Sequence, residues 1–272
     1  MRAVLQFAAA WLIAFGLASS ASALPSIQDG LVAAWTLNGN ANDLTSHGHH
    51  GLVVGAVATA DRFGNDNGAY SFAPLAARIE LPLIFSSHVP QLTYTAWIGD
   101  WRGSRGTIYG EFTSHGRTRN YFLAGGLDPG SQLALATYPP SYAADAHIGS
   151  DLSYQDEDWI HIAIVRDGAD VSGYVNGVLQ GTVTTVGTYS GSAPFIAAMG
   201  SRYNPFANGW NGYGNGTYQF RGVIDELFIY DRALSSTEIA SLYTPVPEPS
   251  TALLIGLGLG ALSLCKAREI MG

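Results

Sequence analysis

A short loop near the start of the chain gathers side chains suited to binding a metal ion. It reads Asn-Gly-Asn-Ala-Asn-Asp over residues 38–43, so Asn38, Asn40 and Asp43 offer amide, carboxylate and backbone oxygens. Calcium takes about six to eight oxygen ligands of these kinds, and glycine and asparagine let a loop turn so that its carbonyls converge. The loop therefore offers the kinds of oxygen that calcium binds. The alternative is that Asp43 caps a turn.

The histidines favour solvent or the core over a transition metal. His47, His49 and His50 lie close together after this loop, in a glycine-containing segment without a cysteine partner, and a solvated loop is the favoured interpretation. His161 stands alone in an apolar run, where a histidine is more often hydrogen-bonded in a core or at a sheet edge than a metal ligand.

A second candidate site is an insertion over residues 202–218 that combines aromatic rings with asparagine amides. Flat apolar faces beside bidentate hydrogen-bonding groups are what sugar recognition uses, and loops of this length are usually functional or mobile. The predicted ligand-binding residues are Tyr203, Trp210, Asn211 and Tyr213. Trp101, on another loop, is a candidate for the same surface. The alternative is a self-packed loop whose aromatic rings cover a sheet edge.

These loops require a framework of short strands. Alternating apolar residues with β-branched or aromatic content predict strands over residues 30–37, 51–57, 69–72, 78–81, 92–98, 106–110, 121–125, 132–137, 159–166, 170–175, 178–183, 195–199 and 223–230. Turn-forming Gly, Asn, Asp, Ser and Pro separate them. Many short strands with frequent turns predict an all-β fold, an antiparallel β-sandwich.

Three local signals refine this framework. Asn176-Gly177 between two strands predicts a type I′ hairpin, which needs positive φ at both central residues. Ser235 and Glu238 form a capping box before one short C-terminal helix. Residues 159–165 alternate with apolar side chains on both faces, which predicts a strand near the centre of a sheet.

The composition excludes one class of partner. The formal net charge is −8, and the only lysine, Lys266, lies in the C-terminal tail. Because affinity for phosphate backbones comes from clustered Lys and Arg, we expect no nucleic-acid binding. The only cysteine, Cys265, is also in the tail, and a body over residues 24–244 is large enough for a substantial core without disulfides.

The N-terminus predicts export. Arg2, an apolar run over residues 3–17 and small residues ending at Ala23 form a secretory signal peptide over residues 1–23. A transmembrane helix is the alternative, which the short length and the cleavage site argue against.

The C-terminal tail, residues 245–272, has an ordered series of parts. Pro247, Glu248 and Pro249 precede an apolar run over residues 252–264 and a weakly basic end. This order resembles the PEP-CTERM sorting signal, which implies an exosortase-type processing enzyme and transient insertion in the inner membrane. The apolar run covers only about 20 Å as a helix, against a hydrocarbon core of about 30 Å. The alternatives are an ordinary C-terminal anchor and, less favoured, a buried helix.

Three segments of the body carry a second resemblance. Residues 30–51, 159–177 and 220–235 resemble, in order and spacing, the laminin-G-like, concanavalin A-like jelly-roll domains of bacterial surface proteins. The resemblance implies two curved antiparallel sheets. It also implies a role in binding carbohydrate or protein, often with calcium.

The same resemblance implies a partner for Asp43. It pairs an early loop acid with the acid of the Ile-Asp-Glu strand, so the predicted structural calcium (Ca2+) site combines Asp43 and Asp225 with oxygens around Asn38 and Asn40. The alternative for Asp225 is a pair with an arginine.

Catalytic acids are not indicated. Glucanases of this fold carry Glu-x-Asp-x-x-Glu on one strand, so that two carboxylates share a cleft, and that motif is missing here. Asp225 and Glu226 are adjacent in a strand, and alternation would place them on opposite faces. We therefore expect a non-catalytic, exported recognition or structural module of the cell surface or extracellular matrix that binds an extracellular polysaccharide or surface glycan. The alternatives are a divergent glycoside hydrolase or polysaccharide lyase, and a protein–protein adhesion module.

Overall fold

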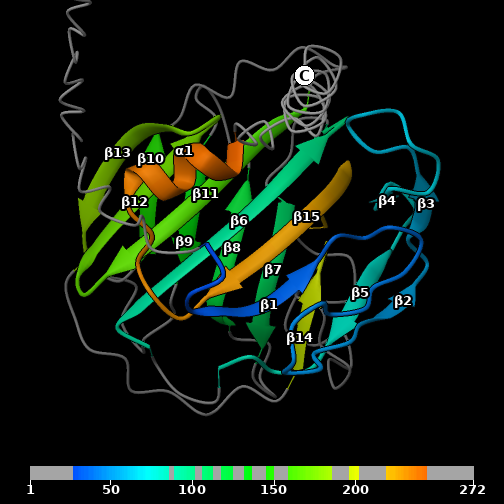
Figure 1. The fold of residues 1–272 in the computed structure, drawn as a ribbon, viewed down its shortest axis with the longest axis horizontal. Helices are drawn as coiled ribbons and strands as arrows, with labels where there is room; N and C mark the ends of the chain where they lie inside the picture. Colours follow the sequence, from blue (N-terminus) through cyan, green and yellow to red (C-terminus); the bar gives the residue numbers. More distant parts are fainter. Residues whose placement is uncertain are drawn as a thin grey trace, which may run out of the picture.

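Two antiparallel sheets stack face to face in the computed structural model (Figure 1). The structure describes residues 27–85, 89–101, 106–112, 118–124, 132–136, 145–149, 159–185, 196–201 and 219–243. The predicted all-β sandwich is confirmed.

Sheet A has eight described strands, with the order β13-β12-β11-β6-β15-β4-β3 and with β1 also paired to β15. Its strands are β1 (Leu31–Trp35), β3 (Val57–Thr59), β4 (Ala69–Ser71), β6 (Gln91–Gly99), β11 (Ile160–Asp167), β12 (Asp170–Val175), β13 (Val178–Thr184) and β15 (Val223–Tyr230). The first and last described strands, β1 and β15, therefore lie side by side.

Sheet B has seven described strands, with the order β10-β9-β8-β7-β14-β5-β2. Its strands are β2 (Leu52–Val54), β5 (Arg78–Leu81), β7 (Gly106–Phe112), β8 (Thr118–Ala124), β9 (Gln132–Ala136), β10 (Asp145–Gly149) and β14 (Ile196–Met199). The chain crosses between the sheets at several points, including the passage from β14 to β15.

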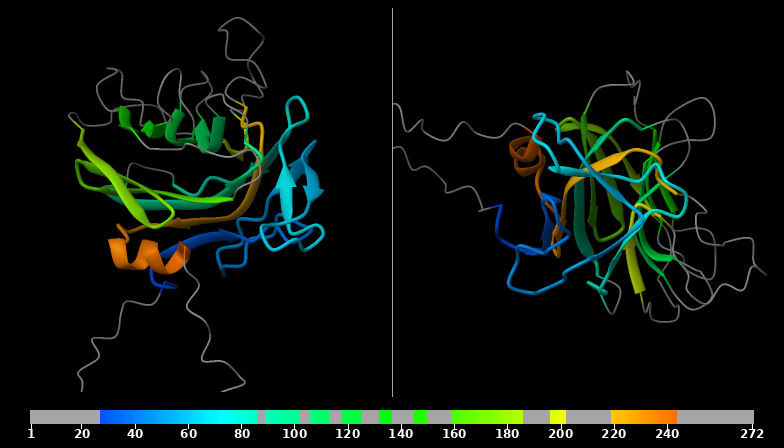
Figure 2. Two further views of the ribbon diagram at one scale, coloured as in Figure 1. Left: turned by 90° about the horizontal axis from the view of Figure 1, so that it is seen from above. Right: turned by 90° about the vertical axis from the view of Figure 1, so that its right-hand side faces the viewer.

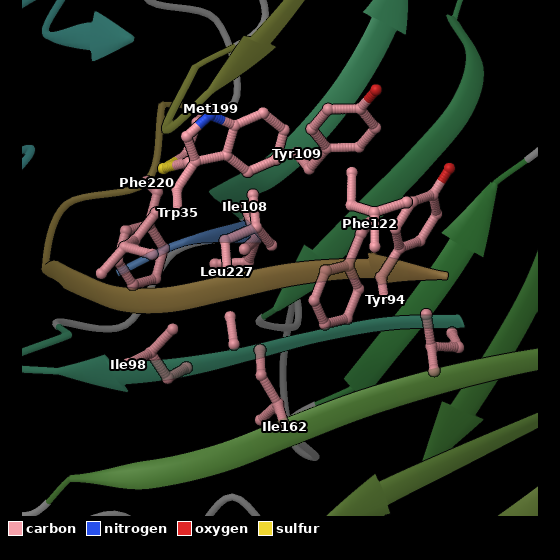
Figure 3. Packing of buried hydrophobic residues seen from close by; sticks show 14 of the residues in the cluster. Trp35, Tyr94, Ile98, Ile108, Tyr109, Phe122, Ile162, Met199, Phe220 and Leu227 are labelled. Atoms are coloured by element: carbon pink, nitrogen blue, oxygen red, sulfur yellow. The ribbon is translucent and has the colours of Figure 1, made fainter. Parts of the chain in front are cut away.

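The core lies between the two sheets (Figure 3). Alternation along β11 directs Ile160, Ile162 and Ile164 into it, where the facing sheet contributes rings such as Tyr109 and Phe122. Each fully buried side chain of this size contributes about 1.5–3 kcal/mol relative to exposure. The central position of β11, between β12 and β6, confirms the prediction from its two apolar faces.

The outer face of sheet A is partly covered by the helix α1 (Ser236–Tyr243). Figure 2 shows α1 on the side of this sheet away from sheet B. Ala163, Val165 and Tyr174 of the sheet pack there against Leu234 and Ile239. The outer face is therefore a second, smaller apolar layer.

Three local outcomes bear on the sequence predictions. The hairpin turn is confirmed, since Asn176 and Gly177 both have positive φ, 49° and 75°. The single strand predicted over residues 51–57 is wrong: Gly55, at φ 73°, ends β2 in sheet B before β3 begins in sheet A. Strand β10 was not predicted, because its sequence Asp-Ala-His-Ile-Gly has little β-branched content.

Candidate functional site

The Asp43 carboxylate is saturated by hydrogen bonds from the protein. Its Oδ1 accepts the backbone N–H groups of Ala34 at 3.0 Å and Thr45 at 2.9 Å. Its Oδ2 accepts the Thr45 hydroxyl and the His49 N–H, both at 2.8 Å. Burial acts to raise the pKa of Asp43, but these bonds outweigh it and the pKa is lowered. Asp43 thus caps the turn that holds β1, which was the alternative to a metal ligand.

The neighbouring loop also uses its oxygens internally. The Asn40 side chain donates to the Asn38 carbonyl at 3.0 Å and accepts the Asn42 N–H at 2.8 Å. The His50 ring nitrogen Nδ1 accepts the Asp43 N–H at 3.1 Å. Within the described residues, no group of three or more His, Cys, Asp or Glu side chains is arranged to hold a metal ion.

Asp225 lies in a β-bulge on the outer face of sheet A. It pairs with Trp97 of β6, but the next registered pair joins Phe228 to Thr95, so Glu226 and Leu227 oppose a single residue. Glu226 takes the left-handed conformation, with φ 49°. The bulge breaks the alternation, and the expectation that Asp225 and Glu226 point to opposite faces is wrong: both reach the same arginine.

That arginine is Arg62, from the loop between β3 and β4. Its two terminal nitrogens lie 2.9 Å from Asp225 Oδ2 and 2.9 Å from Glu226 Oε2. The guanidinium carbon stands 4.3 Å from the ring centre of Phe63 and 4.6 Å from that of Trp97. Arg62 is therefore held by two carboxylates and by contact with two aromatic rings.

A compact turn aims Arg62 at the sheet. The Asp61 carboxylate accepts the N–H groups of Phe63 and Asn65 at 2.8 Å each, and the Asn65 side chain at 2.9 Å. A Cβ on Gly68 would come within 2.7 Å of Asp61, so glycine lets this loop close tightly.

Burial governs the electrostatics of Asp225, whose side chain is only 3% exposed. Desolvation, together with the negative charge of Glu226, raises the pKa of Asp225 to about 7, and Arg62 offsets only part of this effect. Without Arg62, two adjacent acids would have no opposing charge from this loop.

The same cluster extends to the end of the described chain. Trp97 lies 5.3 Å from the ring of His161 and stacks on Tyr243, the last residue of α1, at 5.7 Å. His161 is 2% exposed, and its Nδ1 lacks a hydrogen-bond partner among the described residues. Burial and the nearby positive charge of Arg62 lower its pKa to about 3. His161 is thus a neutral, buried histidine beside Trp97 and Tyr243, but the hydrogen bond that the sequence interpretation favoured is missing at Nδ1 among the described residues.

The carboxylate oxygens of Asp43 and Asp225 do not fit the calcium site expected from the resemblance. A calcium ion needs carboxylate oxygens that are free to turn toward it. Asp43 already accepts four hydrogen bonds, and Asp225 is paired with Arg62. Neither carboxylate is therefore arranged to bind calcium.

The second candidate site has a closed base. The Phe220 N–H donates to the Gly200 carbonyl at 2.8 Å, and Gly200 donates to Ile108 at 3.0 Å. Gly200 has φ 83°, and a Cβ there would come within 2.0 Å of Phe72, so only glycine fits. The described residues on either side of the insertion, Gly200 and Phe220, therefore lie side by side in the sandwich.

Trp101 belongs to this base. Its ring is parallel to that of Phe220 within 9°, at 6.4 Å, and it is 6% exposed. The structure thus brings Trp101 beside Phe220, which follows the insertion, but its ring is buried. Tyr203, Trp210, Asn211, Tyr213, Pro247, Glu248 and Pro249 lie outside the described residues.

One buried acid was missed by the sequence predictions. Glu111 of β7 is fully buried and accepts the Phe85 N–H and the Tyr109 hydroxyl, each at 3.0 Å. Burial and this acid raise the pKa values of Tyr94 and Tyr109 well above the ordinary value. Figure 3 shows both tyrosine rings in the core between the sheets, where they are closed to solvent. This cluster is structural.

Comparison with known proteins identifies the fold family. The model of the laminin G group, described as the concanavalin A-like lectin/glucanases superfamily, matches residues 77–240, more than half of the chain. The chain belongs to this superfamily. Residues 245–268 match the PEP-CTERM protein-sorting motif.

Solved structures share the concanavalin A-like sandwich. Domain 4 of AbnA, a GH43 extracellular arabinanase from Geobacillus stearothermophilus, in complex with arabinotriose, is 21% identical, with a TM-score of 0.54. The match covers 79% of this chain and 98% of that domain. Among curated proteins, none matches.

Toxin binding domains give a second group of similar structures. The botulinum neurotoxin serotype D ligand binding domain, in complex with N-acetylneuraminic acid, is 15% identical, with a TM-score of 0.56. The binding domain of Paraclostridial Mosquitocidal Protein 1 is 16% identical, with a TM-score of 0.57. Each match covers 80% of this chain but only 51% and 53% of the other, so about half of each toxin domain is spanned.

The sorting motif implies export to the surface and exosortase processing. In the part of the chain that the structure describes, no helix has the length and apolar character needed to cross a membrane. The predicted apolar runs over residues 3–17 and 252–264 lie outside that part.

The superfamily resemblance alone did not point to Arg62 or Glu226. A signal for the bulge was nevertheless present: Ile224, Leu227 and Ile229 all face the core, and a spacing of three followed by two breaks strand periodicity. No sequence pattern pointed to Arg62, which lies 163 positions from Asp225.

Proposed function

We propose that this chain is an exported, non-catalytic recognition module that binds an extracellular polysaccharide or surface glycan through the insertion at residues 202–218. The observation that carries the proposal is the closed base between Gly200 and Phe220. A rigid sandwich that presents one long loop is the usual arrangement of a binding site. The aromatic and amide residues expected to contact sugar are Tyr203, Trp210, Asn211 and Tyr213.

The similar structures support a carbohydrate ligand. The arabinanase domain is described with arabinotriose and the neurotoxin domain with N-acetylneuraminic acid. Identities of 21% and 15% establish the fold alone, so the sugar of this chain is a separate question. The net charge of −8 favours neutral over anionic glycans, because like charges repel.

The described acids support a binding role over hydrolysis. Glycoside hydrolysis needs two carboxylates that face a common sugar, roughly 5–10 Å apart. Asp225 and Glu226 instead share Arg62, and Glu111 is enclosed in the core.

We propose an exosortase-type enzyme as the partner of the tail, with only transient attachment to the inner membrane.

A glycan-binding assay on the full chain in mild detergent tests the proposal. We expect Trp210→Ala and Tyr213→Ala each to weaken binding about tenfold or more, for a polysaccharide that the unsubstituted chain binds. This is a loss of about 1.4 kcal/mol in binding free energy. Leu75→Ala is the matched control, since Leu75 is 79% exposed and lies outside the insertion.

Two outcomes would contradict the proposal. Release of reducing ends from the same polysaccharide panel would show a glycan-cleaving enzyme. Attachment to cells that competing sugars leave unchanged would show protein–protein adhesion.

A further inference from the structure

One of the two acids to which the family resemblance assigns a metal ion, Asp225, is already paired with a positive charge. Arg62 Nη1 contacts Asp225 and Arg62 Nη2 contacts Glu226, both at 2.9 Å. The two carboxylates are thus bridged by one planar group through separate nitrogens. We infer that the Arg62 guanidinium is the resident cation at Asp225, in place of a divalent ion bound by this acid.

The surroundings suit a guanidinium. Its carbon lies 4.3 Å and 4.6 Å from the ring centres of Phe63 and Trp97. A guanidinium is planar and weakly hydrated, so it stacks on aromatic rings at little desolvation cost. A calcium ion binds protein oxygens and water molecules. The two aromatic rings offer no oxygen ligand. The two rings therefore favour arginine over calcium.

Burial makes the arrangement exclusive. The side chains of Arg62 and Asp225 are 12% and 3% exposed. A calcium ion would have to displace the guanidinium, and Arg62 would then lose both of its ion pairs. Breaking a buried pair costs far more than breaking an exposed one, so the protein should not exchange this cation for calcium.

The cation joins three parts of the fold that are distant in sequence. Its loop precedes β4, its two acids lie in β15, and the Trp97 ring beneath it stacks on Tyr243 at the end of α1. A side chain thus fastens the loop between β3 and β4 to the last described strand of the domain.

Thermal unfolding of the full chain in mild detergent tests the inference, first without any substitution. We expect the same midpoint in excess EDTA and in millimolar calcium, because a ligand that binds only the folded state would raise it. A calcium-dependent rise that Asp225→Asn abolishes would overturn the inference and restore the metal site.

Replacing the cation gives the second arm. Arg62→Met should lower the midpoint in EDTA by roughly 6 °C or more. Calcium should then restore part of the loss, since two acids have been freed. The matched control is Arg78→Met, whose pair with Glu80 lies within one strand. Equal, calcium-insensitive losses in the two variants would contradict the inference.

Terbium luminescence excited through tryptophan provides a readout that does not depend on the size of a stability change. Terbium is a calcium substitute, and Trp97 lies beside the site. Arg62→Lys keeps the positive charge beside the two acids, so it should give no terbium signal, which keeps the test usable even if Arg62→Met does not fold. We expect a terbium signal in Arg62→Met that Asp225→Asn with Glu226→Gln removes. Tryptophan-sensitised terbium binding to the unsubstituted chain, lost in Asp225→Asn, would overturn the inference.

Discussion

The carboxylates of two buried aspartates, Asp43 and Asp225, are stabilised in different ways. Asp43 accepts four hydrogen bonds from neutral donors, and its pKa is lowered. Asp225 accepts a guanidinium hydrogen bond beside a second acid, and its pKa is raised to about 7. Backbone N–H groups stabilise a carboxylate without adding a second charge to be desolvated. Asp43 can therefore stay ionised within a turn, whereas Asp225 depends on Arg62.

The buried imidazole of His161 gives a pH-dependent prediction. Its pKa of about 3 in the folded chain lies below the ordinary 6.5, so only the unfolded chain takes up a proton between these values. Its contribution to the unfolding free energy is complete above pH 6.5 and falls by about 1.4 kcal/mol per pH unit below it. The titratable or charged groups facing it are Arg62 and Tyr243.

Denaturant unfolding of the chain and of His161→Gln, at pH 7.5 and pH 4.5, measures this effect. We expect the difference between them to move about 2–3 kcal/mol in favour of the variant at the lower pH. Parallel pH profiles would show that His161 is protonated equally in both states. His47→Gln, at an exposed position, is the control.

Most of the strands were predictable because their signals are local. Alternation and turn residues gave nearly every strand of both sheets, and Asn176-Gly177 fixed a turn. The split at Gly55 was not predictable, since a change of sheet depends on what each half packs against. Arg62 and Asp225 are 163 positions apart in the sequence, so no local pattern predicts that they pair. Sequence reasoning identified both buried aspartates and the arginine alternative, but not which arginine.

The helix α1 begins as its sequence predicts. Ser235 is the N-cap, its N–H and hydroxyl each donate to Glu238 at 2.8 Å, and its oxygen accepts the Glu238 N–H at 3.3 Å. Arg232 adds an ion pair at 2.6 Å. Its hydrogen bond, with those from Ser235, outweighs the effect of burial and lowers the pKa of Glu238 to about 2.

We expect Glu238→Gln to lower the unfolding free energy by about 1–2 kcal/mol at pH 7. The folded pKa lies below the unfolded value of 4.5, so the stabilisation is complete above pH 4.5 and disappears as the pH falls toward 2. The loss should therefore shrink at pH 2.5, as measured by urea unfolding. A loss that is independent of pH would contradict the ionic contribution. Glu80→Gln, in a pair within one strand, serves for comparison.

The folded domain and the sorting motif are close neighbours along the chain. Tyr243 packs against Trp97, and the motif match begins at residue 245. The outer face of sheet A therefore holds the chain immediately before the segment that an exosortase would read. Only residue 244 separates the described domain from the matched sorting motif in the sequence.

Alanine substitution of Pro247, Glu248 and Pro249 together should block processing in a bacterium that has an exosortase. We expect the variant to remain full length in the membrane fraction, whereas the unsubstituted chain is shortened and leaves it. Immunoblotting of membrane and external fractions measures this. Met271→Ala, beyond the matched residues, should behave as the unsubstituted chain. Normal shortening of the triple variant would show that these residues are not read.

The closed base between Gly200 and Phe220 has a consequence for how this protein can diversify. Since Gly200 and Phe220, on either side of the 202–218 segment, are hydrogen-bonded to each other, the length and composition of that segment can change at little cost in folding free energy. Loop-closure entropy grows only by about 0.6 kcal/mol for each doubling of length. Related proteins can therefore acquire new binding specificities by changing the segment that corresponds to residues 202–218, while the β-sandwich stays the same.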